Sequence, residues 1–320
     1  INPLDNLQIF AFVAFMVAFS GSIQDIAIDA FRIELVDLNQ QGNLAASYQF
    51  GYRIAILASS SFALIFAADN GWSQTYQLMA LMMVVGILGV LICPETKNDN
   101  LKKLNFQNSI IEPLKDFFSR FGLYFASFIL MIIATYRLTD IVMGPMASPF
   151  YLEKGYTLKE IGYIVKVVAV LTSILGFFLG GLFVKRFGVK VTLIFGAILV
   201  LLTNISFSFV AVLEKDLYLL GIIVGFDSLA AGVVGTANIT FLTSLVSKKY
   251  TAVQYALLTS FMMLPGKVFS GFSGVLANSF KAQFGVESGW MSFFVFTSLL
   301  TIPSLLLLIF YLKKNQLNDA

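Results

Sequence analysis

Long apolar stretches separated by short polar segments dominate the chain. A helix that crosses a membrane needs about 20 predominantly apolar residues, and nine stretches reach that length. They run over residues 7–35, 43–68, 73–94, 122–149, 158–184, 190–213, 217–246, 252–279 and 289–312. The pattern therefore predicts an all-α polytopic membrane protein with nine transmembrane helices.

The longest polar stretch, residues 94–121, is too polar to cross a membrane. The spacing of its apolar residues Leu114, Phe117, Phe118 and Phe121 predicts a short amphipathic helix at the membrane surface. Three apolar stretches precede this segment and six follow it. We therefore expect residues 1–94 to form three helices of an N-terminal bundle, residues 95–121 a central loop, and residues 122–320 a six-helix C-terminal bundle.

Composition shows why lipid is the natural surrounding of this chain. Of the 320 residues, 58% are hydrophobic and 12% are charged, whereas a soluble globular domain carries about 25% charged residues. The net charge of +3 is too small to indicate a nucleic acid partner. Membrane lipid is therefore the expected partner, and nothing in the sequence indicates an obligate protein partner.

The side chains available for chemistry form a narrow set. The chain has no histidine, and Cys93 is its one cysteine. These counts exclude an internal disulfide, histidine-based metal sites and Ser-His-Asp catalysis. The phosphate-loop pattern G-x-x-x-x-G-K-S/T is also absent from the sequence. We expect no enzyme activity, no metal and no cofactor. Because the chain has no histidine, any proton chemistry must use carboxylates, lysine or tyrosine.

Basic residues are distributed unevenly between alternate loops. With the central loop on the cytoplasmic side, twelve loop lysines and arginines fall on that side and four on the outer side. Cytoplasmic loops of membrane proteins carry such an excess, so the central loop and the C-terminus are predicted to be cytoplasmic. The chain begins at Ile1 without Met, and we expect three further helices of the N-terminal bundle to precede it.

Charged side chains inside the apolar stretches mark candidate functional positions. One ionisable side chain at the centre of a span costs about 2.5–3.5 kcal/mol on insertion, so it normally faces a polar cavity or a partner. Asp25, Asp29 and Arg32 share one helical face of the first stretch. Arg32 is expected to pair with Asp29, which leaves Asp25 more isolated. The group is either a structural ion pair or part of a transport path.

The second apolar stretch carries Arg53. This side chain either pairs with Asp25 or Asp29 of the first stretch, or extends towards the membrane interface as long basic side chains do. The sequence leaves both alternatives open.

The fourth apolar stretch combines an expected ion pair with two prolines. Arg137 and Asp140 are three residues apart, on one helical face, and Tyr136 precedes them. Pro145 and Pro149 predict a kinked or broken outer end of this helix, a feature that transporters place at substrate sites. The alternative is a neutralised ion pair that binds no ligand.

Three lone charges, Lys166, Asp227 and Lys267, lie in three later stretches. Each has apolar neighbours along the chain and must find its partner in the bundle interior. One alternative is a structural ion pair between Asp227 and one of the two lysines. The other is a positively charged cavity, formed by both lysines and Arg137, that binds an anionic solute.

Two small-residue motifs predict close packing of helices. Gly176 with Gly180, and Gly221 with Gly225, match the GxxxG pattern that lets helix backbones approach in a membrane.

Ten residues around the boundary of the fifth and sixth stretches resemble a loop signature of the major facilitator superfamily. The matching positions are Gly181, Lys185, Arg186, Gly188 and Lys190. The segment lies between the second and third stretches after the central loop, where that superfamily carries its signature. Lys185 departs from the pattern, because the superfamily usually has Asp at this position.

The first apolar stretch resembles a more specific signature. Its residues 22–32, SIQDIAIDAFR, are similar to the fourth-helix sequence ATQDIVIDAYR of the AmpG-like muropeptide permeases. Further positions fall in register over nearly the whole chain: Gly51-Tyr52-Arg53, Tyr136-Arg137 with Asp140, Lys166, Asp227, Gly235-Thr236-Ala237, residues 254–258 and Lys267.

This resemblance implies a helical bundle of the major facilitator superfamily, with about nine of an expected twelve transmembrane helices present. It also implies a multi-pass symporter of the bacterial inner membrane that imports anhydro-muropeptides from periplasm to cytoplasm for peptidoglycan recycling, driven by protons. The alternative is a relative that transports another anionic solute, such as acetyl-CoA, a nucleotide or a drug.

Candidate site residues follow from the charges and the resemblance together. The proton-coupling candidates are Asp25, Asp29, Asp140 and Asp227. The substrate-binding candidates are Gln24, Arg53, Tyr136, Arg137, Lys166 and Lys267. Arg137, Lys166 and Lys267 suit the carboxylates of a sugar-peptide.

Overall fold

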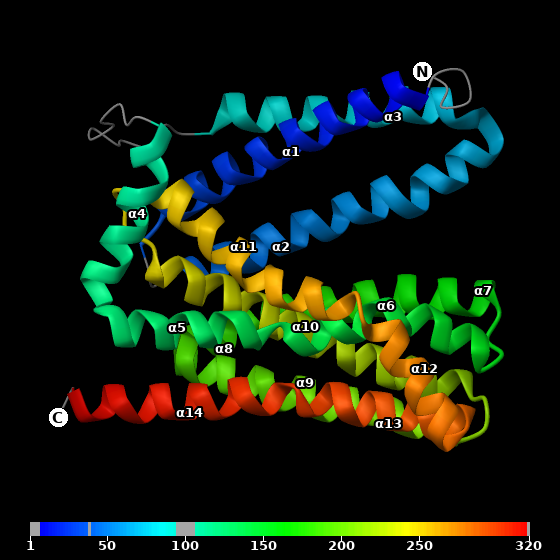
Figure 1. The fold of residues 1–320 in the computed structure, drawn as a ribbon. Helices are drawn as coiled ribbons and strands as arrows, with labels where there is room; N and C mark the ends of the chain where they lie inside the picture. Colours follow the sequence, from blue (N-terminus) through cyan, green and yellow to red (C-terminus); the bar gives the residue numbers. More distant parts are fainter. Residues whose placement is uncertain (1–6, 38–39, 94–105, 319–320) are drawn as a thin grey trace.

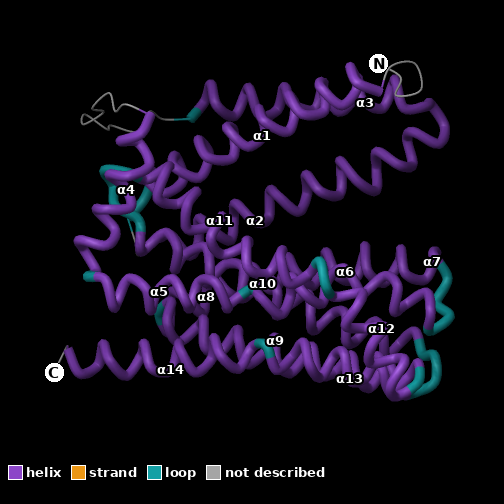
Figure 2. The backbone as a smooth tube through the Cα atoms, viewed as in Figure 1, coloured by secondary structure: helices purple, strands orange, loops and turns teal. Residues whose placement is uncertain are grey.

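The computed structural model describes residues 7–37, 40–93 and 106–318. These residues form helices joined by short turns, and none of them forms a strand (Figures 1 and 2). The fold class is therefore the predicted all-α one. The first part of the expected central loop, residues 95–105, lies outside the described residues.

The helices before the central loop form a group that we call the N-terminal segment. It consists of α1 (Leu7–Leu35), α2 (Gln41–Leu57), the π-helical turn η2 (Ala58–Phe62) and α3 (Ala63–Ile92). Within α3, Gly71 adopts φ of +77°, a left-handed conformation that glycine reaches without a steric penalty. This residue therefore divides α3 into a short first part and a long apolar second part.

The helices after the central loop form the C-terminal bundle, which α4 (Phe106–Phe121) precedes. Its elements are α5 (Leu123–Tyr136), α6 (Leu138–Glu153), α7 (Leu158–Ile161), the π-helical η3 (Gly162–Val168), α8 (Ala169–Phe187), α9 (Val189–Val212), α10 (Leu217–Leu245), α11 (Thr251–Ser270), α12 (Ser273–Phe284), α13 (Val286–Leu299) and α14 (Thr301–Asn318). Helices α5 and α6, and likewise α13 and α14, follow each other as nearly continuous rods (Figure 2).

Seven helices of the described chain are long and apolar enough to cross a membrane. They are Leu7–Leu35, Asn70–Ile92, Leu123–Glu153, Ala169–Phe187, Val189–Val212, Leu217–Leu245 and Val286–Lys313. Of the other two predicted spans, 43–68 covers α2, η2 and the first residues of α3, and 252–279 covers α11 with α12. These two spans are helical but do not belong to the apolar set, so their crossing of the membrane stays a prediction.

The C-terminal bundle buries two apolar clusters at opposite ends of α9 and α10. The first joins these helices to α5, α11 and α14 and includes the fully buried Ile129, Ile132 and Leu242. The second joins them to α6 and α13 and includes Phe150, Phe207 and Phe294. Because lipid is as apolar as these side chains, close packing rather than exclusion of water holds the clusters together.

Helix α4 is the amphipathic helix that the sequence predicts. It runs across the ends of α5 and α11, nearly perpendicular to the long helices (Figure 1). Phe117 is buried in the first apolar cluster, and Phe118 and Phe121 pack against that cluster. Leu114 is 40% exposed, and the position of the helix at the membrane surface stays a prediction. The helix therefore attaches to the bundle through its phenylalanines.

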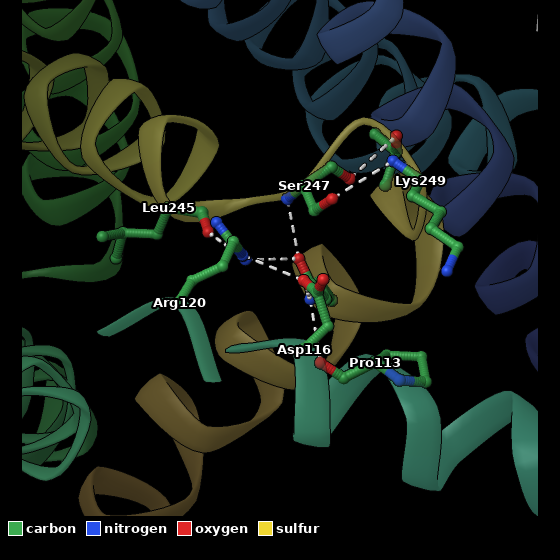
Figure 3. A network of polar contacts seen from close by, with 8 residues as sticks. Pro113, Asp116, Arg120, Leu245, Ser247 and Lys249 are labelled. Carbon is green, nitrogen blue, oxygen red and sulfur yellow. Dashed lines mark hydrogen bonds and ion pairs between the residues drawn. The ribbon is translucent and has the colours of Figure 1, made fainter. Parts of the chain in front are cut away.

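A buried glutamine, Gln254 of α11, fixes α4 to the turn between α10 and α11. Figure 3 labels its partners Pro113, Asp116, Arg120 and Ser247. The Gln254 Nε2 donates to the Pro113 carbonyl oxygen at 2.8 Å and to Asp116 Oδ2 at 2.9 Å. Its Oε1 accepts from the Ser247 backbone N–H at 2.7 Å and from Arg120 Nη2 at 3.0 Å. The Gln254 side chain takes part in all four of these hydrogen bonds. Because its partners Asp116 and Arg120 lie on α4, we expect α4 and α11 to move as one unit.

Replacing Gln254 with leucine is expected to release α4 from the bundle. The substitution keeps the approximate volume but removes four hydrogen bonds, and each buried polar group left unpaired costs about 1–3 kcal/mol. Limited trypsin digestion measures the release as faster cleavage after Lys115, which lies on α4. Gln283→Leu, at an exposed position of α12, is the matched control. Equal cleavage rates in the two variants would show that Gln254 does not hold α4.

Glycines let α8 and α10 cross at backbone contact. A methyl group at Gly176 would lie 3.0 Å from Cα of Leu229, and one at Gly180 would lie 3.0 Å from Cα of Val233. The prediction from the first GxxxG motif is therefore confirmed. The prediction from the second motif is wrong: a methyl group at Gly221 would meet no described atom within 4 Å, and Gly225 has ordinary contacts only.

Candidate functional site

The N-terminal segment contacts the C-terminal bundle through two of its helices. Helix α1 packs against α11, and α2 packs against α8 and α10. The approach is closest near the start of α2, where a methyl group at Gly181 would lie 3.4 Å from the Gly42 carbonyl oxygen. Towards its C-terminal end α2 diverges from the bundle (Figure 1). The two parts therefore meet at the end that α4 crosses.

A buried arginine, Arg32 of α1, lies at this meeting point and is 3% exposed. Its Nε is 3.7 Å from Asp29 Oδ1, which confirms the predicted ion pair. Its Nη1 donates to Gln41 Oε1 of α2 at 3.4 Å. Gln41 in turn donates to the carbonyl oxygens of Ile33 and Val36 at 3.0 Å. These contacts join the end of α1 to the beginning of α2.

The same guanidinium reaches into the C-terminal bundle. Arg32 Nη2 donates to Thr243 Oγ1 of α10 at 3.3 Å. Its Cζ lies 5.3 Å from the ring centroid of Tyr255 in α11 and 5.6 Å from that of Tyr48 in α2. We call Asp29, Arg32, Gln41, Tyr48, Thr243 and Tyr255 the Arg32 cluster. It draws its members from α1, α2, α10 and α11, so it joins the N-terminal segment to the bundle.

Further along α2, Arg53 lies against the bundle, and no described carboxylate forms an ion pair with it. Its guanidinium Cζ is 5.5 Å from the ring centroid of Phe177 in α8. Its Nε is buried and has no hydrogen-bond partner among the described residues. The ion pair with Asp25 or Asp29 that the sequence left open is not formed. Arg53 is instead close enough to Arg137 for their like charges to repel each other.

Arg137 occupies the junction between α5 and α6. Its Nε lies 3.4 Å from Asp140 Oδ2, so the predicted ion pair is present. The same Nε lacks a hydrogen bond within the described part of the chain. The pair is therefore loose, and the remaining guanidinium donors of Arg137 are not committed to Asp140.

Asp227 of α10 interacts with Thr203 and with the Asp140 carboxylate. Its Oδ1 accepts a hydrogen bond from Thr203 Oγ1 of α9 at 3.0 Å. It is close enough to Asp140 for the two carboxylates to interact electrostatically. The structural ion pair with Lys267 that the sequence left open is not formed. We call Arg53, Arg137, Asp140, Thr203 and Asp227 the central cluster.

The other candidate residues lie outside the central cluster or cannot be assigned to it. Gln24 and Asp25 are exposed on α1. Tyr136 is buried, and its hydroxyl donates to the Leu193 carbonyl oxygen at 3.1 Å. Lys267 is exposed on α11 and forms no ion pair with a described residue. The side chain of Lys166 lies outside the described residues.

The loop that resembles the facilitator signature uses its glycines for geometry. Gly188 adopts φ of +80° between α8 and α9, a left-handed conformation that a side chain would strain. Gly181 lets α8 approach α2, because a methyl group there would already touch Ala46 Cβ at 3.4 Å. Both signature glycines therefore serve the turn and the helix contact.

Two basic residues of this loop lie over aromatic rings, and a third lines a groove. Lys190 Nζ lies 5.1 Å from the ring centroid of Tyr311, and Arg186 Cζ lies 5.4 Å from that of Phe187. Lys185 is exposed and lines a groove of about 650 Å³ between α2 and α8. The groove's other lining residues are Val36, Gln40, Asn43, Leu44, Ser47, Val184, Gly188 and Val189.

Several residues of these clusters are not among the candidates from sequence. Thr203, Thr243 and Phe177 became partners of charged groups only through tertiary packing. Asn204, beside Thr203, is 1% exposed, and both of its side-chain polar atoms lack a partner in the described structure. The sequence could have marked two of them as candidates, because the polar residues Thr203 and Asn204 of α9 interrupt a strongly apolar run.

No group of three or more Cys, Asp or Glu side chains that could hold a metal ion occurs in the described parts of the chain.

Comparison with known proteins gives one matching family and several similar transporters. The family model described as Major Facilitator Superfamily matches residues 3–270. The chain is 33% identical to "Putative transporter AmpG 4" of Rickettsia conorii, over 98% of this chain and 75% of the relative. It is 31% identical to "Putative transporter AmpG 1" of Rickettsia bellii, over 99% and 77%. It is 29% identical to "Anhydromuropeptide permease" of Escherichia coli K12, over 100% and 64%.

Proposed function

The chain belongs to the major facilitator superfamily and to its AmpG-like permease family, and from this premise we propose that it imports anhydromuropeptides across the bacterial inner membrane. The proposed direction is from periplasm to cytoplasm, with protons as the coupled ion. The central loop and the C-terminus then face the cytoplasm. As a multi-pass transporter of this family, the protein moves a solute rather than transforming it.

The observation that carries this proposal is the central cluster. Arg137 pairs with Asp140 at the α5–α6 junction, and α2 and α10 contribute two further charged groups: Arg53 lies against Phe177 of α8, and Asp227 accepts a hydrogen bond from Thr203 of α9. Charged groups within membrane helices are costly and mark solute or ion pathways. A site between two helical bundles is also where secondary transporters hold their solute. A sugar-peptide with free carboxylates suits the two arginines.

Asp227 is the carboxylate best placed to carry the coupled proton. Its hydrogen-bond partner is the Thr203 hydroxyl rather than a cation. A negative charge at this position has the Asp140 carboxylate beside it, whereas a protonated Asp227 would not repel Asp140. By contrast, Asp29 and Asp140 each have an arginine as ion-pair partner. Asp25 remains the second candidate, because it is exposed on α1.

Uptake of radiolabelled anhydromuropeptide into inverted or right-side-out vesicles tests this function. An imposed proton gradient is expected to drive accumulation, and a protonophore is expected to abolish it. Asp227→Asn is expected to lose accumulation at least tenfold while it retains downhill exchange, because asparagine cannot take up a proton. Asp25→Asn, measured in parallel, ranks the second candidate.

Asp216→Asn is the matched control for these variants. Asp216 precedes α10 and caps it by accepting from the Tyr218 and Leu219 N–H groups, a role that asparagine also fills. Its uptake is expected to equal that of the unmodified protein. Accumulation that survives the protonophore would overturn proton coupling. Uptake of acetyl-CoA or a nucleotide in place of the muropeptide would overturn the proposed solute.

A further inference from the structure

We propose that Asn204 of α9 holds ordered water inside the C-terminal bundle, and that this water delivers the coupled proton to Asp227 through the Thr203 hydroxyl. The water site follows from the packing around Asn204 and does not depend on any assignment of function. The proton route rests on the proposed function, because it deepens the role of Asp227 as the proton carrier.

Asn204 is a polar side chain in the apolar interior of the bundle, with 1% of its surface exposed. Val200, one turn before it on α9, belongs to the first apolar cluster, and Phe207, one turn after it, belongs to the second. Residues three or four apart share a helical face, so Asn204 lies between the two clusters. Neither its Oδ1 nor its Nδ2 has a hydrogen-bond partner among the described residues. Because a buried polar group left unpaired costs about 1–3 kcal/mol, both atoms point to a ligand at this level.

Helix α13, which packs against α9, brings a second polar group to the same level. Lys190 at the start of α9 lies over the Tyr311 ring of α14, and the Phe207 ring lies 5.5 Å from the Phe294 ring of α13. Both contacts correspond to one antiparallel register of α9 with α13 and α14. That register places Thr297 of α13, which is fully buried, opposite the Asn204 amide.

Water is the ligand that these two side chains fit. An amide has an acceptor oxygen and two N–H donors, whereas a hydroxyl has one proton and an acceptor oxygen. The Thr297 hydroxyl donates its proton to the carbonyl oxygens of Phe293 and Phe294 at 3.0 and 3.1 Å, so its oxygen can accept from a ligand. Water accepts from Asn204 Nδ2 and donates to Asn204 Oδ1 and to Thr297, and buried water typically forms about three hydrogen bonds. An ion would satisfy only one of the two amide atoms and would bring a charge into apolar surroundings.

The Thr203 hydroxyl, next to Asn204 on α9, links this water to Asp227. Thr203 Oγ1 lies 3.0 Å from Asp227 Oδ1 and 3.2 Å from the Val200 carbonyl oxygen. A hydroxyl has one proton, so these two acceptors compete for it, and a protonated Asp227 ends the competition by donating to Oγ1. An excess proton carried by the water passes to Oγ1 while the hydroxyl proton passes to Asp227. The water and the hydroxyl are thereby regenerated, and the carboxylate becomes a carboxylic acid.

Radiolytic labelling of the full chain in lipid nanodiscs tests the water site. An X-ray pulse generates hydroxyl radicals from bound water, and mass spectrometry measures the oxidation of the nearest side chains. Phe207, one turn from Asn204, and Phe241 of the first apolar cluster are 2% and 3% exposed. Phe207 is expected to be oxidised severalfold faster than Phe241 in the unmodified protein, because only Phe207 lies beside the water. This comparison needs no variant.

Two leucine variants of α9 separate bound water from other causes of labelling. Asn204→Leu keeps the approximate volume and removes both polar atoms, so it is expected to lower the oxidation of Phe207 severalfold. It is not expected to raise the melting temperature, because it removes a side chain whose polar atoms are satisfied. Ser206→Leu is the matched control, since the Ser206 hydroxyl donates only within α9, to the Leu202 carbonyl oxygen. It is expected to leave the oxidation of Phe207 unchanged.

Uptake of anhydromuropeptide into vesicles tests the proton route. Asn204→Leu is expected to slow proton-driven accumulation severalfold while it retains downhill exchange. A merely structural defect would lower both rates together. Ser206→Leu is expected to accumulate the solute like the unmodified protein.

The outcomes distinguish the water site, the proton route and the function on which the route rests. Equal oxidation of Phe207 and Phe241 in the unmodified protein overturns the water site, and so does a melting temperature of Asn204→Leu above that of the unmodified protein. Loss of Phe207 oxidation in Asn204→Leu with unchanged accumulation overturns the proton route and leaves the permease function standing. Absence of muropeptide uptake by the unmodified protein overturns the proposed function and the route with it, whereas the labelling result still decides the water site.

Discussion

A leucine in place of Gly176 is expected to destabilise the C-terminal bundle by about 3 kcal/mol or more. The first carbon of the new side chain would overlap the Leu229 carbonyl oxygen and would lie 3.0 Å from the Leu229 Cα and carbonyl carbon. These atoms belong to the backbone of α10, which cannot rotate away as a side chain can. The two helices must therefore separate, and the contacts along their whole crossing weaken together. Thermal unfolding in detergent, followed by size-exclusion chromatography, measures the loss.

Gly221→Leu provides the matched control on α10. A methyl group at Gly221 would meet no described atom within 4 Å, so the substitution is expected to change stability by about 0.5 kcal/mol or less. Both glycines occupy the first position of a GxxxG motif within an apolar helix. If the two leucine variants melt at the same temperature, the backbone contact of α8 with α10 is not what stabilises the bundle.

The two GxxxG motifs show what a local pattern can and cannot predict. Small residues four apart create a flat helix face, and this part of the prediction follows from the sequence. Whether another helix lies on that face depends on how the bundle packs. Gly176 and Gly180 meet α10, whereas Gly221 meets no atom of the described residues within 4 Å. The sequence alone could not separate the two cases, because the motif is the same in both.

The charged residues also fall into two groups: those whose partner lies on the same helix could be predicted, and those whose partner lies on another helix could not. The pairs Asp29–Arg32 and Arg137–Asp140 were predicted because both members lie three residues apart on one helix. The position of Arg53 was left open, since its neighbours Phe177 and Arg137 come from other helices. The partners of charged groups on separate helices depend on helix rotation and crossing, which no short stretch of sequence encodes.

Two of the predicted spans at the junction of the two parts are less apolar than the others. Helices α2 and α11 fall outside the apolar set, although both carry predicted spans. Helix α2 packs on α8 and α10, and α11 packs on α1 and α5. Their polar residues, such as Gln41 and Gln254, satisfy buried groups of neighbouring helices. A helix whose polar face is covered by protein has no need of the apolar composition that lipid requires.

Replacing Arg32 with methionine is expected to open the end of the molecule where the N-terminal segment meets the C-terminal bundle. Arg32 is 3% exposed, and its guanidinium donates to Gln41 of α2 and to Thr243 of α10. Methionine fills much of the space but leaves the partly buried Asp29 without its cation. Breaking a buried ion pair from one side costs about 3–5 kcal/mol, so the closed arrangement loses a large part of its stabilisation.

The opening is measured as a distance across the contact. Nitroxide labels on cysteines at Ser47 of α2 and Lys185 of α8, both beside the groove between these helices, report the separation by double electron–electron resonance after Cys93→Ser. The unmodified arrangement is expected to give one narrow distance distribution. Arg32→Met is expected to shift it to longer distances and to broaden it.

Asp29→Asn shows which contacts of Arg32 matter for closure. This variant removes the ion pair but keeps the hydrogen bonds of Arg32 to Gln41 and Thr243 and its position over the Tyr255 ring. A smaller shift than in Arg32→Met is therefore expected, since only those contacts reach across to α10 and α11. An unchanged distribution in Arg32→Met would assign closure to the glycine contact of α2 with α8 instead. Equal shifts in both variants would assign it to the charge of Asp29, because the contacts to Thr243 and Tyr255 would then add nothing.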